Sequence, residues 1–260
     1  MEKNNRHNQI IQFLSDTEYA NIGTLAKHFS VSTMTIRRDL KTLEALKLIR
    51  LFYGGAALNK DFEERTKLND LKYIFQAQHQ QKIEEKNRIG KLAASFVSDG
   101  DVIIVDSGTT TEIFVRSIPA SLSITVVCYT FNILDIVRQR SNWQLVLVGG
   151  QYHPSTMMFE SEEGLNLIEN IRANKAFIAA GGISETLGIT CINRYETPTK
   201  KAAIRSSAER FLLADSSKFG KVVQSYYAEL DEFHTIITDN MLSQEYKEIL
   251  TGKNINLILA

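Results

Sequence analysis

Apolar positions in the first 60 residues recur at the spacing of short amphipathic helices. In three stretches an apolar residue returns every third or fourth position, as on a helix with one buried face. These residues are Ile10, Ile11, Phe13 and Leu14, then Leu25, Ala26 and Phe29, then Ile36, Leu40, Leu43 and Leu46. The break "SVS" at 30–32 separates the last two stretches, so the pattern predicts three helices with a tight turn before the third.

The third predicted helix has a second, positively charged face. At about 100° per residue, Arg37, Arg38 and Lys41 fall with Met34 in an arc of roughly 100° opposite the apolar stripe. Ser32 precedes the helix and is a suitable N-cap, because its hydroxyl can accept a hydrogen bond from a backbone N–H of the first turn. One face of this helix is therefore expected to pack and the other to carry positive charge.

The segment "LKLIRLFYGGAAL" that follows predicts a β-hairpin, with strand-like residues at 48–52 and a turn at Gly54-Gly55. A hairpin after a helix-turn-helix is a wing, and an α-helix fits the DNA major groove. We therefore expect residues 1–60, the head, to bind double-stranded DNA. The expected contacts are Ser32, Thr33, Thr35, Arg37, Arg38, Lys41 and, on the wing, Arg50. A charged helix face that meets only solvent is the alternative interpretation.

Charge is unevenly distributed, although the chain carries 30 basic and 30 acidic residues. Residues 1–60 hold nine Lys and Arg against five Asp and Glu, so the head carries +4 and residues 61–260 carry −4. This imbalance favours a polyanionic partner for the head, although a bias of this size also arises by chance.

Several kinds of site are disfavoured by the sequence. Cys128 and Cys191 form no CxxC, and the five histidines show no HExxH, so we expect no disulfide framework, metal or cofactor. The chain also lacks GxxxxGK[ST] and GxGxxG, which disfavours nucleoside triphosphate and dinucleotide sites. Nothing resembles a signal peptide, and no run of 18 apolar residues occurs, so we expect a cytoplasmic protein without membrane contact.

Beyond residue 60, short apolar runs alternate with helix-compatible sequence. The polar segment 61–85 contains no Gly or Pro and predicts a helical connector. The apolar runs are "VIIV" (102–105), "ITVV" (124–127), "LVLV" (145–148), "AFIAA" (176–180), "FLLA" (211–214), "TIIT" (235–238) and "INLILA" (255–260). This βαβ pattern predicts that residues 86–260, the body, form a largely parallel α/β domain.

Ligands of parallel sheets bind beyond the carboxyl ends of the strands, so the residues that follow each run are candidates. After the first run, "DSGTTTEIF" combines a glycine with hydroxyl groups at a helix start, which suits a phosphate or carboxylate. The candidates are Asp106, Ser107, Gly108, Thr109, Thr110, Thr130, Asn132, Gly149, Gly150, Gly181, Glu196, Lys200 and Lys218. Ser and Thr are also ordinary helix caps, a lone Lys is commonly a surface residue, and Asp215 can equally be a strand-end cap.

The motifs "LAKHFSVSTMTIRRDL" and "LIRLFYGGAAL" resemble the winged helix-turn-helix of the DeoR family of bacterial transcription regulators. Tyr53 stands where that family commonly has histidine. "DSGTTT", "VGG", "LLADSSKFG" and "IITD" resemble its C-terminal effector domain, whose fold is similar to ribose-5-phosphate isomerases and CoA transferases. The resemblance covers nearly the whole chain and implies a repressor that a phosphorylated sugar releases from its operator.

Departures from the common family pattern fall on the expected ligand-binding rim. Cys128-Tyr129-Thr130 replaces a frequent Thr-Asn-Ser, and "AAGG" at 179–182 begins with alanine. "VCYTFN", "AAGG" and "GITCIN" are most similar to the subgroup that responds to deoxyribose phosphate, which implies deoxyribose 5-phosphate as effector. Helix-turn-helix proteins usually bind as pairs, so a homo-oligomer is expected.

A second hypothesis is a sugar-phosphate isomerase with an appended head. Asp106 or Asp215 would be the base, and Lys218 would stabilise developing negative charge. The intact head argues against this hypothesis, because an isomerase has no need of it. We therefore expect a DNA-binding regulator rather than an enzyme, with no catalytic residues.

Overall fold

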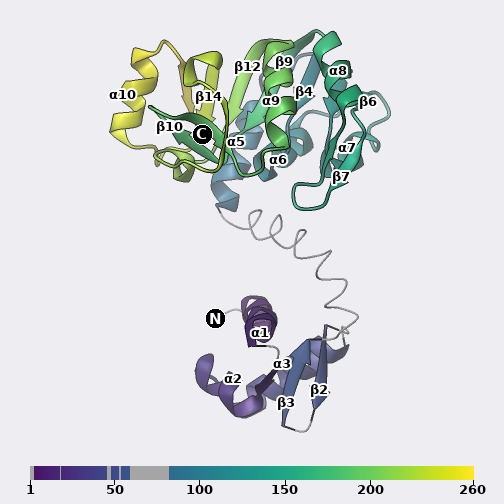
Figure 1. The fold of residues 1–260 in the computed structure, drawn as a ribbon, viewed down its shortest axis with the longest axis vertical. Coiled ribbons are helices and arrows are strands. Elements are labelled where there is room, and N and C mark those ends of the chain that lie inside the picture. The colour runs from purple at the N-terminus through teal and green to yellow at the C-terminus, as the bar shows by residue number, and fades with distance from the viewer. Residues whose placement is uncertain (1–2, 18, 46–47, 53, 59–81) are drawn as a thin grey trace. The chain divides into compact units, whose positions relative to one another are not determined.

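The computed structural model describes residues 3–17, 19–45, 48–52, 54–58 and 82–260 (Figure 1). The chain divides into two compact units, Met1–Leu71 and Lys72–Ala260, which contain the head and the body. The expected boundary near residue 60 and most of the expected connector 61–85 lie outside the described residues. The end of that segment is described, where helix α5 (Ile83–Ala94) begins.

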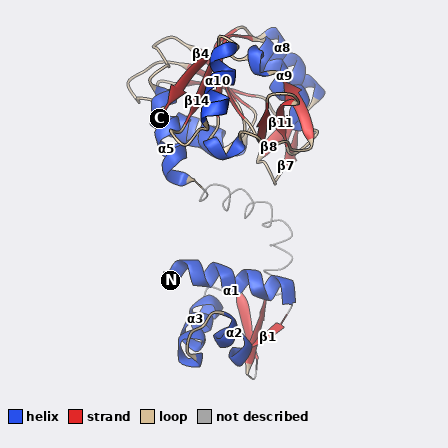
Figure 2. Cartoon of the chain, turned by 90° about the vertical axis from the view of Figure 1, so that its left-hand side faces the viewer, coloured by secondary structure: helices blue, strands red, loops and turns tan. Residues whose placement is uncertain are grey.

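The head has the three predicted helices followed by the predicted hairpin (Figure 2). Its elements are α1 (Lys3–Thr17), β1 (Tyr19–Asn21), α2 (Ile22–His28), α3 (Thr33–Ala45), β2 (Ile49–Phe52) and β3 (Gly55–Leu58). Strand β1 was not predicted; it pairs with β3, so the wing is a three-stranded sheet. The predicted N-cap is confirmed, since the Ser32 hydroxyl accepts from the Thr35 N–H at 3.1 Å. Leu46 and Tyr53 lie outside the described residues.

A buried ion pair joins the first and third helices of the head. Asp39 is fully buried and accepts hydrogen bonds from Arg6 Nε at 2.7 Å and, at 3.1 Å, from His7 Nε2 when that nitrogen carries the proton. Burial alone raises the pKa of Asp39, but the hydrogen bonds from Arg6 and His7 outweigh it and hold the pKa below its usual value. The carboxylate therefore ties α3 to α1 beside the predicted apolar core of Ile10, Leu14, Leu25, Ile36, Leu40 and Leu43.

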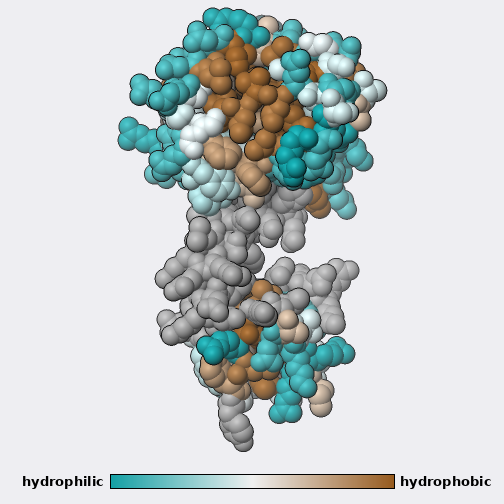
Figure 3. All heavy atoms as spheres, turned by 90° about the vertical axis from the view of Figure 1, so that its right-hand side faces the viewer, coloured by the Kyte–Doolittle hydropathy of each residue, from teal (hydrophilic) through white to brown (hydrophobic). Residues whose placement is uncertain are grey.

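The body is built on a seven-stranded sheet in which every neighbouring pair is parallel, in the order β15-β14-β12-β9-β4-β5-β6. Its strands are β4 (Val102–Val105), β5 (Thr125–Cys128), β6 (Gln144–Leu147), β9 (Ala173–Ala179), β12 (Ser207–Leu213), β14 (Thr235–Thr238) and β15 (Asn256–Leu259). All seven predicted runs are confirmed as strands of this sheet. Strand β6 forms one edge, on the face of the molecule seen in Figure 3.

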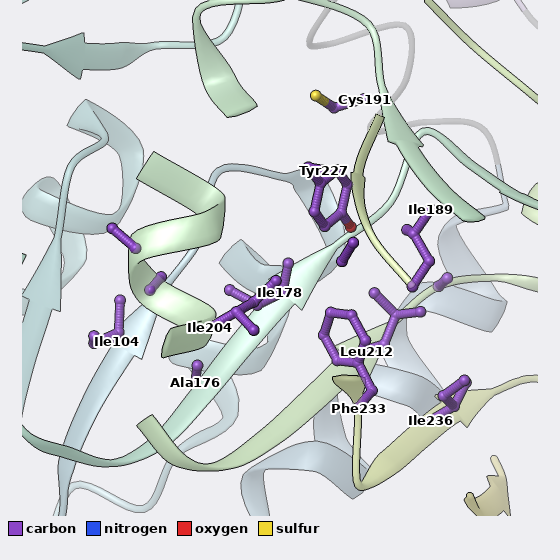
Figure 4. Packing of buried hydrophobic residues seen from close by; sticks show 14 of the residues in the cluster. Ile104, Ala176, Ile178, Ile189, Cys191, Ile204, Leu212, Tyr227, Phe233 and Ile236 are labelled. Atoms are coloured by element: carbon purple, nitrogen blue, oxygen red, sulfur yellow. The ribbon is translucent and has the colours of Figure 1, made fainter. Parts of the chain in front are cut away.

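Helices cover both faces of the sheet because consecutive strand residues point to opposite sides. Helices α5, α6 (Thr109–Ser117) and α7 (Phe131–Val137) pack on one face. Helices α8 (Glu162–Asn170), α9 (Glu196–Arg205) and α10 (Gln244–Gly252) pack on the other. Figure 4 shows this second core, where Ala176 and Ile178 of β9 lie beside Ile204 of α9.

Two small sheets of the body were missed by the sequence analysis. Strands β7 (Gln151–His153) and β8 (Met158–Glu160) form a hairpin. Strands β10 (Gly182–Ser184), β11 (Gly188–Cys191) and β13 (Ser225–Ala228) form an antiparallel sheet. Both are made of strands only three or four residues long, and their formation depends on packing against the body rather than on a regular apolar alternation.

We expect Asp39→Asn to destabilise the head by about 3 kcal/mol, because it leaves the buried Arg6 without a charged partner. Hydrogen exchange of the Leu40 and Leu43 amides in the full chain is the measurement, with rates expected to rise roughly 100-fold. Asp135→Asn is the control, since its ion pair with Arg138 is exposed and contributes at most about 1 kcal/mol. Equal exchange in the two variants would contradict a structural role for Asp39.

Candidate functional site

The positively charged face of α3 is exposed in the head. Four of its side chains are exposed to solvent, those of Thr33, Arg37, Arg38 and Lys41. Thr35 is half-buried. The opposite face is buried and consists of Ile36, Asp39, Leu40 and Leu43. The helix can therefore pack and still present three cations to a partner of the head.

Ser32 and Arg50 flank this face in different ways. The Ser32 side chain is exposed, but its hydroxyl is occupied as the cap of α3 and also lies 2.9 Å from the Thr35 hydroxyl. Arg50 is exposed on β2, one of the two edge strands of the wing. The roles of all seven residues in DNA binding stay predictions.

The second candidate site lies where the sheet of the body changes direction. Strand β4 is central, the chain continues from it to β5 and β6, and β9 then returns to its other side. Such a switch point opens a crevice at the carboxyl ends of the strands. Asp106, directly after β4, is fully buried there and accepts hydrogen bonds from the Tyr129 hydroxyl at 2.6 Å and the Ala179 N–H at 2.8 Å.

Lys200 of α9 is the cationic partner of Asp106, with its Nζ hydrogen-bonded to the carboxylate. The same ammonium donates to the Ala179 carbonyl at 3.2 Å and lies 3.8 Å from the Glu196 carboxylate. Burial lowers the pKa of Lys200, but Asp106 and Glu196 outweigh it and raise the pKa above its ordinary value. Lys200 was predicted to offer its charge to a ligand; the structure shows that charge neutralised within the fold.

Two tyrosines complete this buried network. Tyr129 follows β5 and Tyr227 lies on β13, where its hydroxyl donates to the Ala179 carbonyl at 2.8 Å. Burial, together with the negative charge of Asp106, raises the pKa of both hydroxyls well above the ordinary value, so both remain protonated donors. The sequence analysis did not include either tyrosine among the candidates, and a tyrosine without a motif gives no signal of such a role.

The residues at the start of α6 lie beside the network. Ser107, Thr109 and Thr110 are buried, and the first N–H groups of the helix have no partner within it. A side chain on Gly108 would place its Cβ 2.9 Å from the Cβ of Ala179, so only glycine lets this backbone approach β9. The segment thus presents hydroxyl and amide donors at the switch point, as an anion requires.

Thr130 and Asn132 hold two buried oxygens without a hydrogen-bond partner among the described residues, Thr130 Oγ1 and Asn132 Oδ1. The Asn132 amide nitrogen donates to Glu112 of α6 at 3.0 Å, so the side chain is held while its oxygen stays unsatisfied. The β7–β8 hairpin covers this segment, since the Phe131 N–H donates to the Met157 carbonyl at 2.7 Å. Buried unsatisfied polar atoms are uncommon, and a ligand would satisfy them.

The other predicted ligand residues are more dispersed. Gly149 and Gly150 follow the edge strand β6, and a Cβ on Gly150 would collide with the Glu160 carbonyl at 2.2 Å, so this glycine serves packing. Gly181 donates its N–H to the Thr190 carbonyl and directly precedes β10 of the antiparallel sheet. Lys218 is half-buried in the short helix η1 (Ser216–Lys218), which Asp215 caps by accepting from the Ser217 N–H. Asp215, for which the sequence left a strand-end cap open, is the N-cap of η1, the short helix that follows β12.

Lys86 of α5 is a buried lysine that the sequence analysis did not single out. It is buried, and burial lowers its pKa to about 8; Asp215 opposes this shift and Lys218 adds to it. Both of these residues follow β12, so Lys86 lies near the carboxyl edge of the sheet. Nothing in the sequence distinguishes Lys86 from the other lysines of an amphipathic helix.

No cluster of three or more His, Cys, Asp or Glu residues that could hold a metal ion occurs within the described ranges. None of the helices in that part of the chain is long and apolar enough to span a bilayer.

Comparisons with known proteins cover both units. Residues 6–62 match the DeoR-like helix-turn-helix domain, and residues 81–240 match the DeoR C terminal sensor domain. The chain is 32% identical over 241 residues to the HTH-type transcriptional regulator IolR of Bacillus subtilis, covering 91% of each chain. It is 30% identical over 253 residues to the deoxyribose operon repressor of Escherichia coli, covering 97% of each. Among solved structures, ribose 5-phosphate isomerase A of Methanocaldococcus jannaschii matches 54% of this chain and 55% of its own, with 20% identity and a TM-score of 0.39.

We expect Lys200→Met to destabilise the body by about 3–5 kcal/mol, because it leaves the buried Asp106 carboxylate without its counter-ion. The double variant Asp106→Asn/Lys200→Met should lose less than the sum of the two single losses, since the two residues contact each other. Denaturant unfolding of the full chain measures all three. Additive losses would show that the two side chains do not depend on each other.

Proposed function

Because the chain belongs to the DeoR family of transcriptional regulators, we propose that it is a repressor that binds operator DNA through α3 and is released by a phosphorylated sugar. The observation that carries this proposal is the exposed cationic face of α3, opposite a buried face, on a helix that follows a turn and precedes a wing. The sensor domain of the same family supplies the second half of the proposal.

The DNA contacts are proposed from the chemistry of the exposed face. Arg37 and Arg38 can donate in bidentate fashion to guanine, and Lys41 can neutralise a phosphate. The Thr33 and Thr35 hydroxyls and the capping Ser32 lie at the start of α3, where helix-turn-helix proteins approach the duplex backbone. Arg50 on β2 would reach phosphate or the minor groove beside it.

The effector is proposed to bind at the switch point of the body. The N-terminus of α6, with Ser107, Thr109 and Thr110, would hold the phosphate, and Lys86 and Lys218 would supply positive charge. The unsatisfied oxygens of Thr130 and Asn132 suit sugar hydroxyls, which both donate and accept. Deoxyribose 5-phosphate is the proposed effector, supported by the similarity to the deoxyribose operon repressor.

The isomerase hypothesis is disfavoured by the bonding of Asp106. Its carboxylate is fully buried and already accepts from Tyr129, Ala179 and Lys200, so it is poorly placed to take a proton from a substrate. Asp215 is likewise engaged, as the cap of η1. Incubating the protein with pentose phosphates should therefore give no turnover, and measurable isomerisation would restore the hypothesis.

The proposed function is tested by operator release. An operator is first selected from random-sequence DNA by repeated binding to the full chain. Its affinity is then measured at fixed salt against a panel of sugar phosphates, because phosphate contacts make DNA affinity salt-dependent. Coupling between effector and DNA should be about 1–3 kcal/mol and reciprocal, with deoxyribose 5-phosphate the most effective. Operator binding that no sugar phosphate changes would refute the sensor half of the proposal.

We expect Arg37→Ala to weaken operator binding by about 1–3 kcal/mol and to relax the preference at one base pair, as the loss of one bidentate contact does. Binding to the selected operator and to its single-base variants is the measurement. Arg138→Ala is the matched control, since this exposed arginine lies in the body. Unchanged affinity in Arg37→Ala would reject the proposed orientation of α3 on DNA.

We expect Lys218→Ala to leave operator affinity unchanged and to raise the effector concentration needed for release by about tenfold, because one charge–phosphate contact is lost. Release is titrated with deoxyribose 5-phosphate. Lys253→Ala, an exposed lysine beyond the last turn of α10, is the control and should behave like the unmodified chain. Release at unchanged effector concentration would exclude Lys218 from the binding site.

Effector affinity should depend on pH through Lys86. Its pKa of about 8 means that the protonated form predominates below pH 8, where it attracts a phosphate dianion, and is lost above it. We expect the affinity for the effector to be constant below about pH 8. Above that pH it should fall by as much as about tenfold per pH unit. Calorimetric titration between pH 7 and 9.5 is the measurement. Lys86→Met should bind more weakly and lack this fall; an unchanged pH profile in the variant would exclude Lys86.

A further inference from the structure

An apolar area surrounds the edge strand β6 of the body and is visible as the brown region of Figure 3. Leu147 of β6 is 38% exposed, Leu167 of α8 is 41% exposed and Phe131 of α7 is 50% exposed. Leu145 and Val146 of β6 are half-buried. Exposed apolar areas of this kind on soluble proteins usually mark an interaction surface.

The strand itself is open to pairing. Proteins usually protect edge strands with Lys, Pro or a bulge, because an edge exposes backbone N–H and C=O groups. Strand β6 reads Gln-Leu-Val-Leu and has none of these devices. At the opposite edge, Arg88 places a charge beside β15 and donates to the Ala260 carbonyl at 3.3 Å.

The charges on α8 show which partner fits this edge. Glu169 faces α9, where it pairs with Arg205 at 2.8 Å. Leu167 lies about 200° around the helix from Glu169, and Glu163 lies one turn before Leu167 on the same side. Leu167 and Glu163 are therefore on the flank of α8 turned away from α9, above the sheet edge. Arg172 follows the end of the same helix and is exposed. A helix with an acid at its start and a base beyond its end is complementary to an antiparallel copy of itself.

We propose that two copies of this chain pair through β6 about a two-fold axis perpendicular to the sheet. The two edge strands run antiparallel and satisfy each other's backbone groups. The axis also sets the two α8 helices antiparallel, so that Leu167 meets its counterpart and Glu163 of one copy approaches the partner's Arg172. The occupant is a second copy because the surface is self-complementary in both apolar area and charge. The proposed function agrees with it, because one helix-turn-helix reads only a half-site.

Sedimentation equilibrium of the full chain without DNA tests the surface independently of the proposed function. We expect Leu147→Glu to halve the particle mass and to weaken operator binding roughly 100-fold, since paired heads gain affinity through their linkage. Leu187→Glu is the matched control, because Leu187 is 60% exposed on the loop between β10 and β11 and should keep the original mass.

A charge exchange between exposed residues checks the geometry, and the double variant controls for the two backbone hydrogen bonds that Arg172 donates at the end of α8. Glu163→Arg and Arg172→Glu should each weaken the pairing by about tenfold, and the double variant should restore it. A monomeric unmodified chain, or an unchanged mass in Leu147→Glu and both charge variants, would overturn the proposal. Halving by Leu187→Glu alone would also overturn it and move the interface to the antiparallel sheet.

Discussion

The body depends on one buried carboxylate, that of Asp106. It accepts from a tyrosine that follows β5, from the backbone of β9 and from Lys200 of α9. A buried charge is tolerated only where it is neutralised and hydrogen-bonded, so these three elements must converge on the end of β4. The switch point of the sheet is therefore held by polar contacts within a largely apolar body.

The head applies the same principle on a smaller scale. Asp39 directly follows the two arginines of α3, yet it is turned inward and paired with Arg6 of α1. Its charge is neutralised inside the head, while the cations on the opposite face remain exposed. A helix with this division can be docked firmly and still present nearly undiminished positive charge to a polyanion.

The polar residues at the switch point fall into two sets, those with hydrogen-bond or ionic partners and those with unsatisfied oxygens. The titratable side chains, which an acid–base catalyst would use to transfer protons, are already paired. They are Asp106, Lys200 and Glu196, and each is bonded to another of the three or to the backbone. The Thr130 and Asn132 side-chain oxygens, by contrast, have no hydrogen-bond partner within the described part of the chain. A site whose titratable groups are satisfied while two neutral oxygens remain open is better suited to binding a ligand than to transferring its protons.

Local periodicity was sufficient for the regular elements of this protein. Ile36, Leu40 and Leu43 repeat with the helical period, and runs such as "VIIV" and "TIIT" are too short and too apolar for anything but buried strands. From this pattern the sequence predicted the two faces of α3, the seven parallel strands and the residues that stand at the strand ends. The β7–β8 hairpin was not predicted, because its strands are three residues long and show no alternation of apolar and polar residues.

The sequence by itself determined which elements form and which residues stand at their ends, because those features depend on neighbours within a few positions. Only the tertiary structure decided the partners of those residues. Lys200 meets Asp106 across 94 positions and Arg6 meets Asp39 across 33, and no local pattern encodes such distances. Whether a lysine faces a ligand or neutralises a buried acid is settled by packing, since burial makes an unpaired charge far more costly than an exposed one.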